Sequence, residues 1–239
     1  NLSTALAASN QKVLIIDLDP QGNASTGLGI EYQDRKNSIY EALSGIINLQ
    51  DAVHKTSVSN LFIIPSTVEL SGIEPELADQ NDRAFALKKI LTEDFINQYD
   101  FIYIDCPPAL SLLTVMAMTA SQSVIVPLQC EFFALEGLSQ LIKTIERVKT
   151  NLNENLSIDG IVLTMFDKRN RLSSQVASDV RTHLKEKVYQ TMIPRNVRMS
   201  EAPSFGLPAL IYDHRSKGSQ AYIQLANEIL KKNKNLEAA

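Results

Sequence analysis

Cysteine, long apolar runs and excess basic charge are all scarce in this 239-residue sequence. Its two cysteines, Cys106 and Cys130, lie in no Cys-x-x-Cys or histidine-rich context. A structural zinc site is therefore not expected, and a reducing, cytosolic compartment fits. No apolar run reaches the roughly eighteen residues of a transmembrane helix. The 23 Lys and Arg against 27 Asp and Glu give a net charge of −4, which argues against a globally basic nucleic-acid binder but leaves room for a local patch.

The remaining composition is that of a globular protein. Apolar residues make up 44% of the chain, which excludes disordered, collagen-like and disulfide-scaffold classes. The length fits one large α/β domain or two small ones. No internal repeat, low-complexity segment or convincing linker divides the chain, so we predict a single domain over residues 1–239.

Short runs rich in valine and isoleucine alternate with helical patterns along the chain. The runs have strand length and no strict alternation, which favours strands buried on both faces of a parallel sheet. The expected strands are Val13–Ile16, Leu61–Ile64, Phe101–Ile104, Val124–Val126 and Ile158–Leu163. Apolar residues repeat at helical spacing around residues 84–91, 138–148, 176–184 and 222–230. This alternation predicts a doubly wound, mostly parallel sheet flanked by helices.

Two aspartates end the first expected strand. Asp17 and Asp19 flank one leucine, and Pro20 and Gly22 then turn the chain. Ligands of open α/β sheets bind beyond the carboxyl ends of the strands, and carboxylates suit Mg²⁺ or the waters that it holds. The alternative is that these acids only cap the following segment. The spacing alone does not separate the two interpretations.

A second strand also ends in an aspartate. Four apolar residues lead to Asp105, and Pro107 and Pro108 then stop the strand. This is the shape of a Walker B strand, whose aspartate orients Mg²⁺ and water near a nucleoside triphosphate. Many buried strands end in aspartate, so this motif is weak alone.

Together these segments resemble the ParA/Soj chromosome- and plasmid-partitioning ATPases, within the MinD/ParA group of deviant Walker A proteins. Residues 17–23 (Asp-Leu-Asp-Pro-Gln-Gly-Asn) resemble the switch segment, and residues 105–108 (Asp-Cys-Pro-Pro) resemble the Walker B end. Residues 129–138, 193–204 and 212–213 continue the resemblance in order. It runs from Asn1 to about Leu230 and implies a P-loop NTPase-like fold with ATP and Mg²⁺ as cofactors.

The resemblance implies roles for the three carboxylates. Asp19 would position the attacking water, directly or through Mg²⁺. Asp105 would hold the Mg²⁺ shell through water, and Asp17 would support the same shell. Slow hydrolysis is expected when one carboxylate does the positioning.

Three further residues lie where relatives contact the adenine. Pro194 and Asn196 fall in that segment, and Met165 is placed to flank the base. Ordinary packing at a strand end is an equally good interpretation of these three residues.

One element of the family pattern is absent. The phosphate-binding loop, Lys-Gly-Gly-x-Gly-Lys-Thr/Ser, would precede the segment resembling Asn1–Ala8, and no Gly-Lys-Thr or Gly-Lys-Ser triplet occurs. The opening residues read as a helix already under way, so we interpret the chain as a fragment lacking about twenty residues; a processed N-terminus is the alternative. That loop supplies most of the counter-charge for the triphosphate. We therefore predict no tight ATP binding and no ATPase activity by this chain alone.

A basic segment lies between Asp167 and Arg198. It carries +5, while the rest of the chain carries −9. Such a basic segment can bind nucleic-acid phosphates without sequence preference. Charged residues more often simply form the solvent-exposed face of a helix, and that is the alternative here. By resemblance, Arg169 and Arg198 fall where ParA-like proteins bind nonspecific double-stranded DNA; Arg171 is added from proximity alone. The basic residues are Lys168, Arg169, Arg171, Arg181, Lys185, Lys187, Arg195 and Arg198.

The leading hypothesis is a cytoplasmic, nucleoid-associated partitioning ATPase. ATP would drive formation of a sandwich homodimer that binds DNA, and a ParB-like centromere-binding protein would stimulate hydrolysis, segregating a chromosome or plasmid. A MinD-like membrane-cycling ATPase is a rival, but residues 233–239 offer no apolar face for a membrane, so no membrane partner is expected. A DNA-binding or regulatory relative without a P-loop is the alternative from another class.

Overall fold

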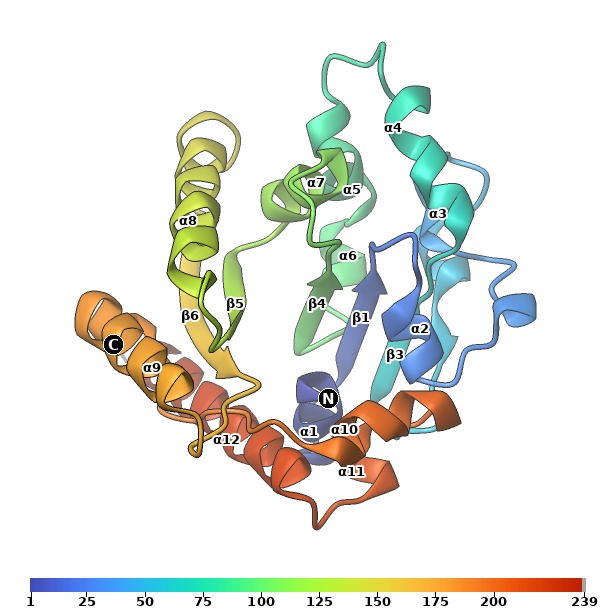
Figure 1. The fold of residues 1–239 in the computed structure, drawn as a ribbon. Helices are drawn as coiled ribbons and strands as arrows, with labels where there is room; N and C mark the ends of the chain where they lie inside the picture. Colours follow the sequence, from blue (N-terminus) through green and yellow to red (C-terminus); the bar gives the residue numbers. More distant parts are fainter. Residues whose placement is uncertain (238–239) are drawn as a thin grey trace. The chain divides into compact units, whose positions relative to one another are not determined.

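The computed structural model describes residues 1–237 (Figure 1). The prediction about residues 233–239 falls partly on Ala238 and Ala239, which lie outside the described residues. None of the described helices is both long and apolar enough to cross a bilayer.

The chain forms two compact units. The N-terminal unit contains Ser3–Ala120 and Glu201–Pro208, and the C-terminal unit contains Asn1–Leu2, Ser121–Ser200 and the residues from Ala209 on. Each has its own parallel strand pairing. The single domain over residues 1–239 stays a prediction, because a division by contacts does not measure cooperative unfolding.

A four-stranded sheet in the order β2-β3-β1-β4 forms the centre of the N-terminal unit (Figure 1). The central strand β1 pairs in parallel with β3 and with β4, and the short β2 adds an antiparallel edge. All five residues of β1 are buried, as a strand covered on both faces requires. The strands are β1 (Val13–Asp17), β2 (His54–Lys55), β3 (Leu61–Ile64) and β4 (Phe101–Asp105).

Helices cover this sheet and enclose its core. Leu14 and Ile16 of β1 lie in one buried cluster with Ile39, Leu87 and Met116, each of which is fully buried. Residues two apart on a strand share a face, so the cluster marks one packed side of the sheet. The helices are α1 (Leu2–Ala8), α2 (Asn23–Gly27), α3 (Ile39–Leu43), α4 (Ile73–Glu76), α5 (Ala86–Ile90), α6 (Glu93–Ile96) and α7 (Leu112–Ala120).

The C-terminal unit is built on one parallel strand pair. Strand β5 (Ser123–Gln129) pairs with β6 (Ser157–Thr164). Two amphipathic helices, α8 (Ala134–Asn151) and α9 (Arg171–Leu184), belong to the same unit and bury one apolar stripe each. The remaining helices are α10 (Val197–Glu201), which ends at the boundary between the units, α11 (Ala209–Tyr212) and α12 (Lys217–Glu237).

The predicted α/β fold with a mostly parallel sheet is confirmed. Every predicted strand is present, with ends that differ by up to three residues. The prediction of strands buried on both faces holds for β1 but is wrong for β4, whose residues are half-buried or exposed, and for β5, where exposed and buried residues mix. Both β4 and β5 are edge strands in the described part of the chain.

Candidate functional site

The carboxyl ends of β1 and β4 bring two predicted site residues together. Asp17 and Asp105 are register partners at the last position of the parallel pair. The pairing continues one residue further, because Leu18 donates its N–H to the Asp105 carbonyl at 2.8 Å. Ligands of parallel sheets bind beyond this edge. The strand register therefore places the two aspartates at one edge of the sheet.

Asp17 is the fully buried member of the group. Its Oδ2 accepts hydrogen bonds from the backbone N–H of Ser25 at 2.8 Å and from the Ser25 hydroxyl at 2.6 Å. Its Oδ1 accepts from the N–H of Asp19 at 3.3 Å. Burial raises the pKa of Asp17, while these three hydrogen bonds act in the opposite direction. With its oxygens directed at this turn, Asp17 is suited to hold the loop rather than to meet a ligand directly.

Asp19 occupies the turn itself and is half-buried. Its Oδ1 accepts the N–H of Gln21 at 3.0 Å, and its carbonyl accepts the N–H of Gly22 at 2.9 Å. Gly22 has φ 62°, the left-handed conformation that glycine adopts without strain. The turn thus keeps the Asp19 carboxylate at the same edge of the sheet as Asp105 while the chain reverses into α2.

Asp105 reaches solvent at the open edge of β4, yet protein surrounds much of its carboxylate. Desolvation raises the pKa of Asp105 to about 6, and the negative charges of Asp17 and Asp19 add to that effect. Three carboxylates so close together repel one another. A cation at this edge would relieve the repulsion, and this part of the site fits a bound Mg²⁺.

The protein ligands alone do not form a metal cage. Among the described residues, no group of three or more His, Cys, Asp or Glu side chains is arranged to hold a metal ion. Mg²⁺ keeps several waters and is usually bound through one or two carboxylates together with phosphate oxygens. The donor set at the ends of β1 and β4 matches that mode.

Cys106 lies next to Asp105 but does not have the properties of a nucleophile. Desolvation and the charges of Asp105 and Asp19 raise the pKa of its thiol to about 12. The thiolate is the reactive form of cysteine, so this thiol is inert at neutral pH.

The predicted adenine residues lie in the C-terminal unit, on two neighbouring segments. Met165 follows β6 with φ 52° and is 37% exposed. Pro194 forms a parallel bridge with Phe166, and Phe166 donates its N–H to the carbonyl of Ile193 at 3.1 Å. Asn196 is half-buried, and its Oδ1 accepts the N–H of Arg198 at 3.0 Å. The structure therefore places the segments that carry Met165 and Pro194 side by side, while the role of these residues toward a base stays a prediction.

The predicted DNA-binding arginines follow these two segments in the chain: Arg169 lies in the loop before α9, Arg171 is the first residue of α9, and Arg198 lies in α10. Arg169 is 85% exposed, and both Nε and Nη2 of its guanidinium donate to Asp167, at 3.0 and 2.8 Å. Arg198 lies 3.6 Å from Asp213, and Arg171 is exposed at the start of α9. The two principal candidates are thus accessible, but each already faces a carboxylate.

Comparison with known proteins decides the family. Residues 1–158 match the protein family described as an AAA domain. The chromosome partitioning protein ParA of Caulobacter vibrioides is 54% identical over 239 residues, which is 100% of this chain and 90% of that protein. The sporulation initiation inhibitor protein Soj of Bacillus subtilis is 48% identical over 96% of this chain and 90% of its own length. The chain belongs to the ParA/Soj family of chromosome-partitioning proteins.

A solved structure agrees with this ParA/Soj assignment. The cobyrinic acid a,c-diamide synthase of Mycobacterium smegmatis, with bound ATP analog and magnesium, superposes with a TM-score of 0.85 at 33% identity. The alignment covers 96% of this chain and 86% of that one. The P-loop NTPase-like fold predicted from the sequence is therefore confirmed.

Sequence reasoning missed three residues of this ParA/Soj site. Ser25 holds Asp17, Ser66 donates its N–H to the Ser25 hydroxyl at 3.1 Å, and Arg35 donates to the Ser66 carbonyl at 3.1 Å. Ser25 is the third residue of the five-residue helix α2, whose N-cap is Gly22, so no capping signal marks it. Arg35 and Ser66 carried no local signal either, because their contacts join distant parts of the chain.

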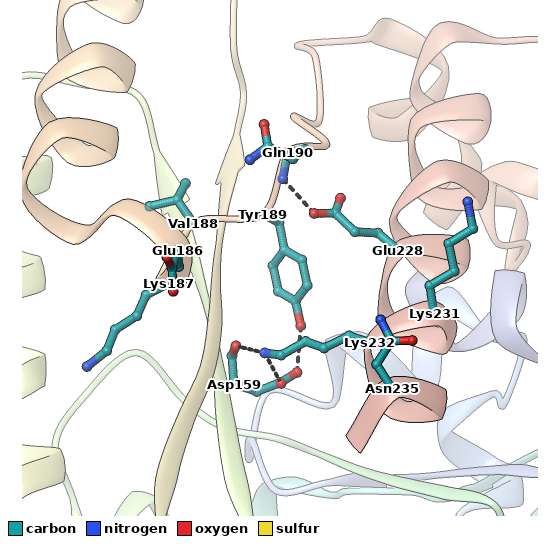
Figure 2. Close-up of a pocket in the computed structure, with 10 residues that line it drawn as sticks. All are labelled: Asp159, Glu186, Lys187, Val188, Tyr189, Gln190, Glu228, Lys231, Lys232 and Asn235. Atoms are coloured by element: carbon teal, nitrogen blue, oxygen red, sulfur yellow. Dashed lines mark hydrogen bonds and ion pairs between the residues drawn. The ribbon is translucent and has the colours of Figure 1, made fainter. Parts of the chain in front are cut away.

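A pocket of about 400 Å³ opens in the C-terminal unit, beside α12 (Figure 2). Among the residues that line it, the Tyr189 hydroxyl donates to Asp159 Oδ2 at 2.5 Å, and Lys232 lies 2.6 Å from Asp159 Oδ1. Glu228 accepts the backbone N–H of Gln190 at 2.6 Å. These contacts connect α12 to Asp159 near the start of β6 and to the segment of Tyr189 and Gln190.

Proposed function

We propose that this chain is a ParA-type partitioning ATPase whose cofactors are ATP and Mg²⁺. One observation supports this most: Asp17 and Asp105 end adjacent parallel strands at one edge, in a chain 54% identical to a chromosome partitioning ParA. The solved relative with an ATP analog and magnesium supports the same cofactors. The protein would act in the cytoplasm on the nucleoid.

Each carboxylate has a distinct part in the proposed hydrolysis. Bound Mg²⁺ supplies charge neutralisation on the phosphate oxygens. Asp19, at the turn, would orient the attacking water, and Asp105 would help to hold the Mg²⁺ through water. Asp17 acts indirectly, because its oxygens hold Ser25 and the N–H of Asp19. Met165, Pro194 and Asn196 would contact the adenine.

The proposed ATPase also needs a phosphate-binding loop that the 239 residues do not contain. Such a loop supplies most of the counter-charge for the triphosphate. The 239 residues by themselves would therefore bind ATP weakly and hydrolyse none.

Dimerisation and DNA binding complete the proposal. Phe132 and Phe133 are 73% and 72% exposed, an unusual fraction for two adjacent aromatic side chains, and we assign them to the contact with a second copy in the ATP-bound dimer. Arg169 and Arg198, with Arg171 nearby, would contact DNA phosphates. A ParB-like partner would stimulate hydrolysis and so release the dimer from DNA.

Phosphate release by the complete protein tests this function. We expect slow hydrolysis that needs Mg²⁺, rises with DNA and a ParB-like partner together, and is abolished in Asp19→Ala. DNA binding should require ATP. Hydrolysis that persists in Asp19→Ala would overturn the assigned role of Asp19. DNA retention without nucleotide, and no hydrolysis by the wild type, would favour a DNA-binding or regulatory relative instead, and flotation with liposomes would favour a MinD-like one.

A further inference from the structure

Arg35 is a buried arginine with an unusual set of partners. Only 5% of its surface is exposed. Its Nε and Nη2 donate to the carbonyl of Ile30 at 3.0 and 2.8 Å, and its Nη1 donates to the carbonyl of Ser66 at 3.1 Å. Nη2 also donates to Oγ1 of Thr26 at 2.7 Å. All three acceptors are neutral, so the guanidinium acts as a multiple hydrogen-bond donor and not as one half of an ion pair. We call these hydrogen bonds from Arg35 to Thr26, Ile30 and Ser66 the Arg35 clamp.

The clamp closes over the segment that carries Asp19. This segment, residues 19–30, contains one five-residue helix, α2, and little other regular structure. Arg35 donates hydrogen bonds to the middle of the segment, at Thr26, and to its end, at Ile30. From the other side, the Ser25 hydroxyl bonds Asp17 and accepts the N–H of Ser66. The segment is therefore held between Asp17, at the end of β1, and Ser66, two residues beyond the end of β3.

The backbone of the segment comes very close to the guanidinium. A Cβ atom at Gly22 would stand 3.1 Å from the Ser66 carbonyl and would overlap Nη1 of Arg35. Thr26 Oγ1 in turn donates to the Gly22 carbonyl at 3.1 Å. The turn that carries Asp19 therefore contacts the Arg35 clamp directly, at Gly22. A movement of the guanidinium would for this reason also move the turn.

Replacement of the clamp would leave acceptors without donors. Ile30 and Ser66 are buried, so a shorter or apolar side chain at position 35 removes hydrogen bonds where water cannot replace them easily. Asp17 provides electrostatic compensation for the buried guanidinium without touching it. Lysine at position 35 would keep the positive charge but cannot donate in the same fork.

We propose that Arg35 is a positioning residue for ATP hydrolysis: its guanidinium fixes residues 22–30 against Ser66 and thereby holds the Asp19 carboxylate in the place from which it orients water. This inference rests on the proposed ATPase function. Arg35 itself contacts no reacting atom, since its donors are engaged by Thr26, Ile30 and Ser66.

The test uses the complete protein and three variants. Arg35→Lys removes the fork and keeps the charge. Thr26→Val removes one acceptor of the Arg35 guanidinium. Because Thr26 is exposed, this variant should fold, and it can be measured even if Arg35→Lys folds poorly. Arg83→Lys is the control, because Arg83 is an exposed arginine of the same unit that bonds a single carbonyl, that of Ala78. The readouts are kcat, KM for Mg-ATP, and amide hydrogen exchange of the nucleotide-free protein.

For Arg35→Lys we expect kcat to fall about 10- to 100-fold with KM unchanged, because a misplaced group far from the bond still costs about that much. Exchange at residues 22–30 should rise while β1 stays protected. Thr26→Val should also lower kcat and raise exchange at residues 22–30, but by less. Arg83→Lys should leave kcat and exchange unchanged.

Wild-type kcat together with wild-type exchange in Arg35→Lys would overturn the proposal, and so would a lower melting temperature with unchanged kcat. If the wild-type protein hydrolyses no ATP, the proposed function fails. The exchange data then decide by themselves whether Arg35 holds the segment.

Discussion

Ser25 binds one oxygen of Asp17 twice, through its backbone N–H at 2.8 Å and its hydroxyl at 2.6 Å, and both residues are fully buried. This contact joins the end of β1 to the start of α2, so it sets the shape of the turn that carries Asp19. The hydroxyl also accepts the N–H of Ser66 at 3.1 Å. One side chain therefore connects three segments of the site.

Ser25→Ala should destabilise the protein by about 1–3 kcal/mol, because it leaves the buried Ser66 N–H without a partner and removes one donor from Asp17. Urea unfolding followed by circular dichroism measures the change. Ser71→Ala is the matched control, since Ser71 is exposed and its hydroxyl bonds only the local carbonyl of Val68. Equal stabilities of the two variants would contradict the role of Ser25.

The pKa of Asp105 predicts a pH dependence of stability in metal-free buffer. Its folded-state pKa is about 6, above the ordinary value of 3.8. The folded state therefore binds the proton more tightly than the unfolded state, and this contribution to stability is complete below about pH 4 and lost as the pH rises through about 6.

Asp105→Asn mimics the protonated form at every pH. As the pH rises from about 4 to about 6, the free energy of unfolding of this variant should therefore increase relative to that of the wild type, and the difference should level off above that range. Denaturant titrations across that range in the presence of a chelator measure the difference. Parallel pH curves for the two proteins would show that burial and the charges of Asp17 and Asp19 do not raise the pKa of Asp105.

The arginines of the basic segment should control the salt dependence of DNA binding in the complete, ATP-bound protein. Arg169→Ala or Arg198→Ala should weaken binding and lower the slope of log affinity against log salt by about 0.9 each, the value for one phosphate contact. Lys143→Ala removes the same charge from an exposed position on α8 and should leave the slope unchanged. Unchanged slopes in both arginine variants would exclude these residues from the DNA interface.

Asp167 competes with DNA phosphate for Arg169. Its carboxylate accepts three bonds from Arg169, counting the backbone N–H, and these hold the pKa of Asp167 at about 2. Asp167→Asn should strengthen DNA binding, because a phosphate then meets an uncommitted guanidinium. Weaker binding by this variant would instead mean that Asp167 orients Arg169 productively.

Two glycines of the C-terminal unit should respond in opposite directions to alanine. A Cβ at Gly160 would overlap the Tyr189 ring, so Gly160→Ala should destabilise the protein by about 1–3 kcal/mol through overpacking. Gly137 lies inside α8 with nothing within 4 Å of its Cβ position, so Gly137→Ala should stabilise by about 0.5–1 kcal/mol. Thermal melts of both variants provide the check, and a stabilising Gly160→Ala would contradict the packing of Tyr189.

Strongly apolar strands and long amphipathic helices were predictable because their signals are local. The strands β1, β3, β4, β5 and β6 and the helices α8, α9 and α12 all follow from such patterns. The two-residue strand β2 was missed, since two residues carry no period. The short helices α2, α3, α4, α6, α7, α10 and α11 were missed as well, because elements of four to nine residues are stabilised mainly by tertiary contacts.

The sequence by itself determined the family, through motifs at the ends of two strands, and it located Asp17, Asp19 and Asp105 beyond apolar runs. Only the tertiary structure decided that Asp17 and Asp105 are register partners. It alone also decided that Arg35 donates a hydrogen bond to Ser66, next to the turn between β1 and α2 that carries Asp19. The physical reason is the range of the interactions. An apolar run is a property of neighbouring residues, whereas the Arg35–Ser66 contact spans 31 positions and forms only when burial leaves the guanidinium no water to bind.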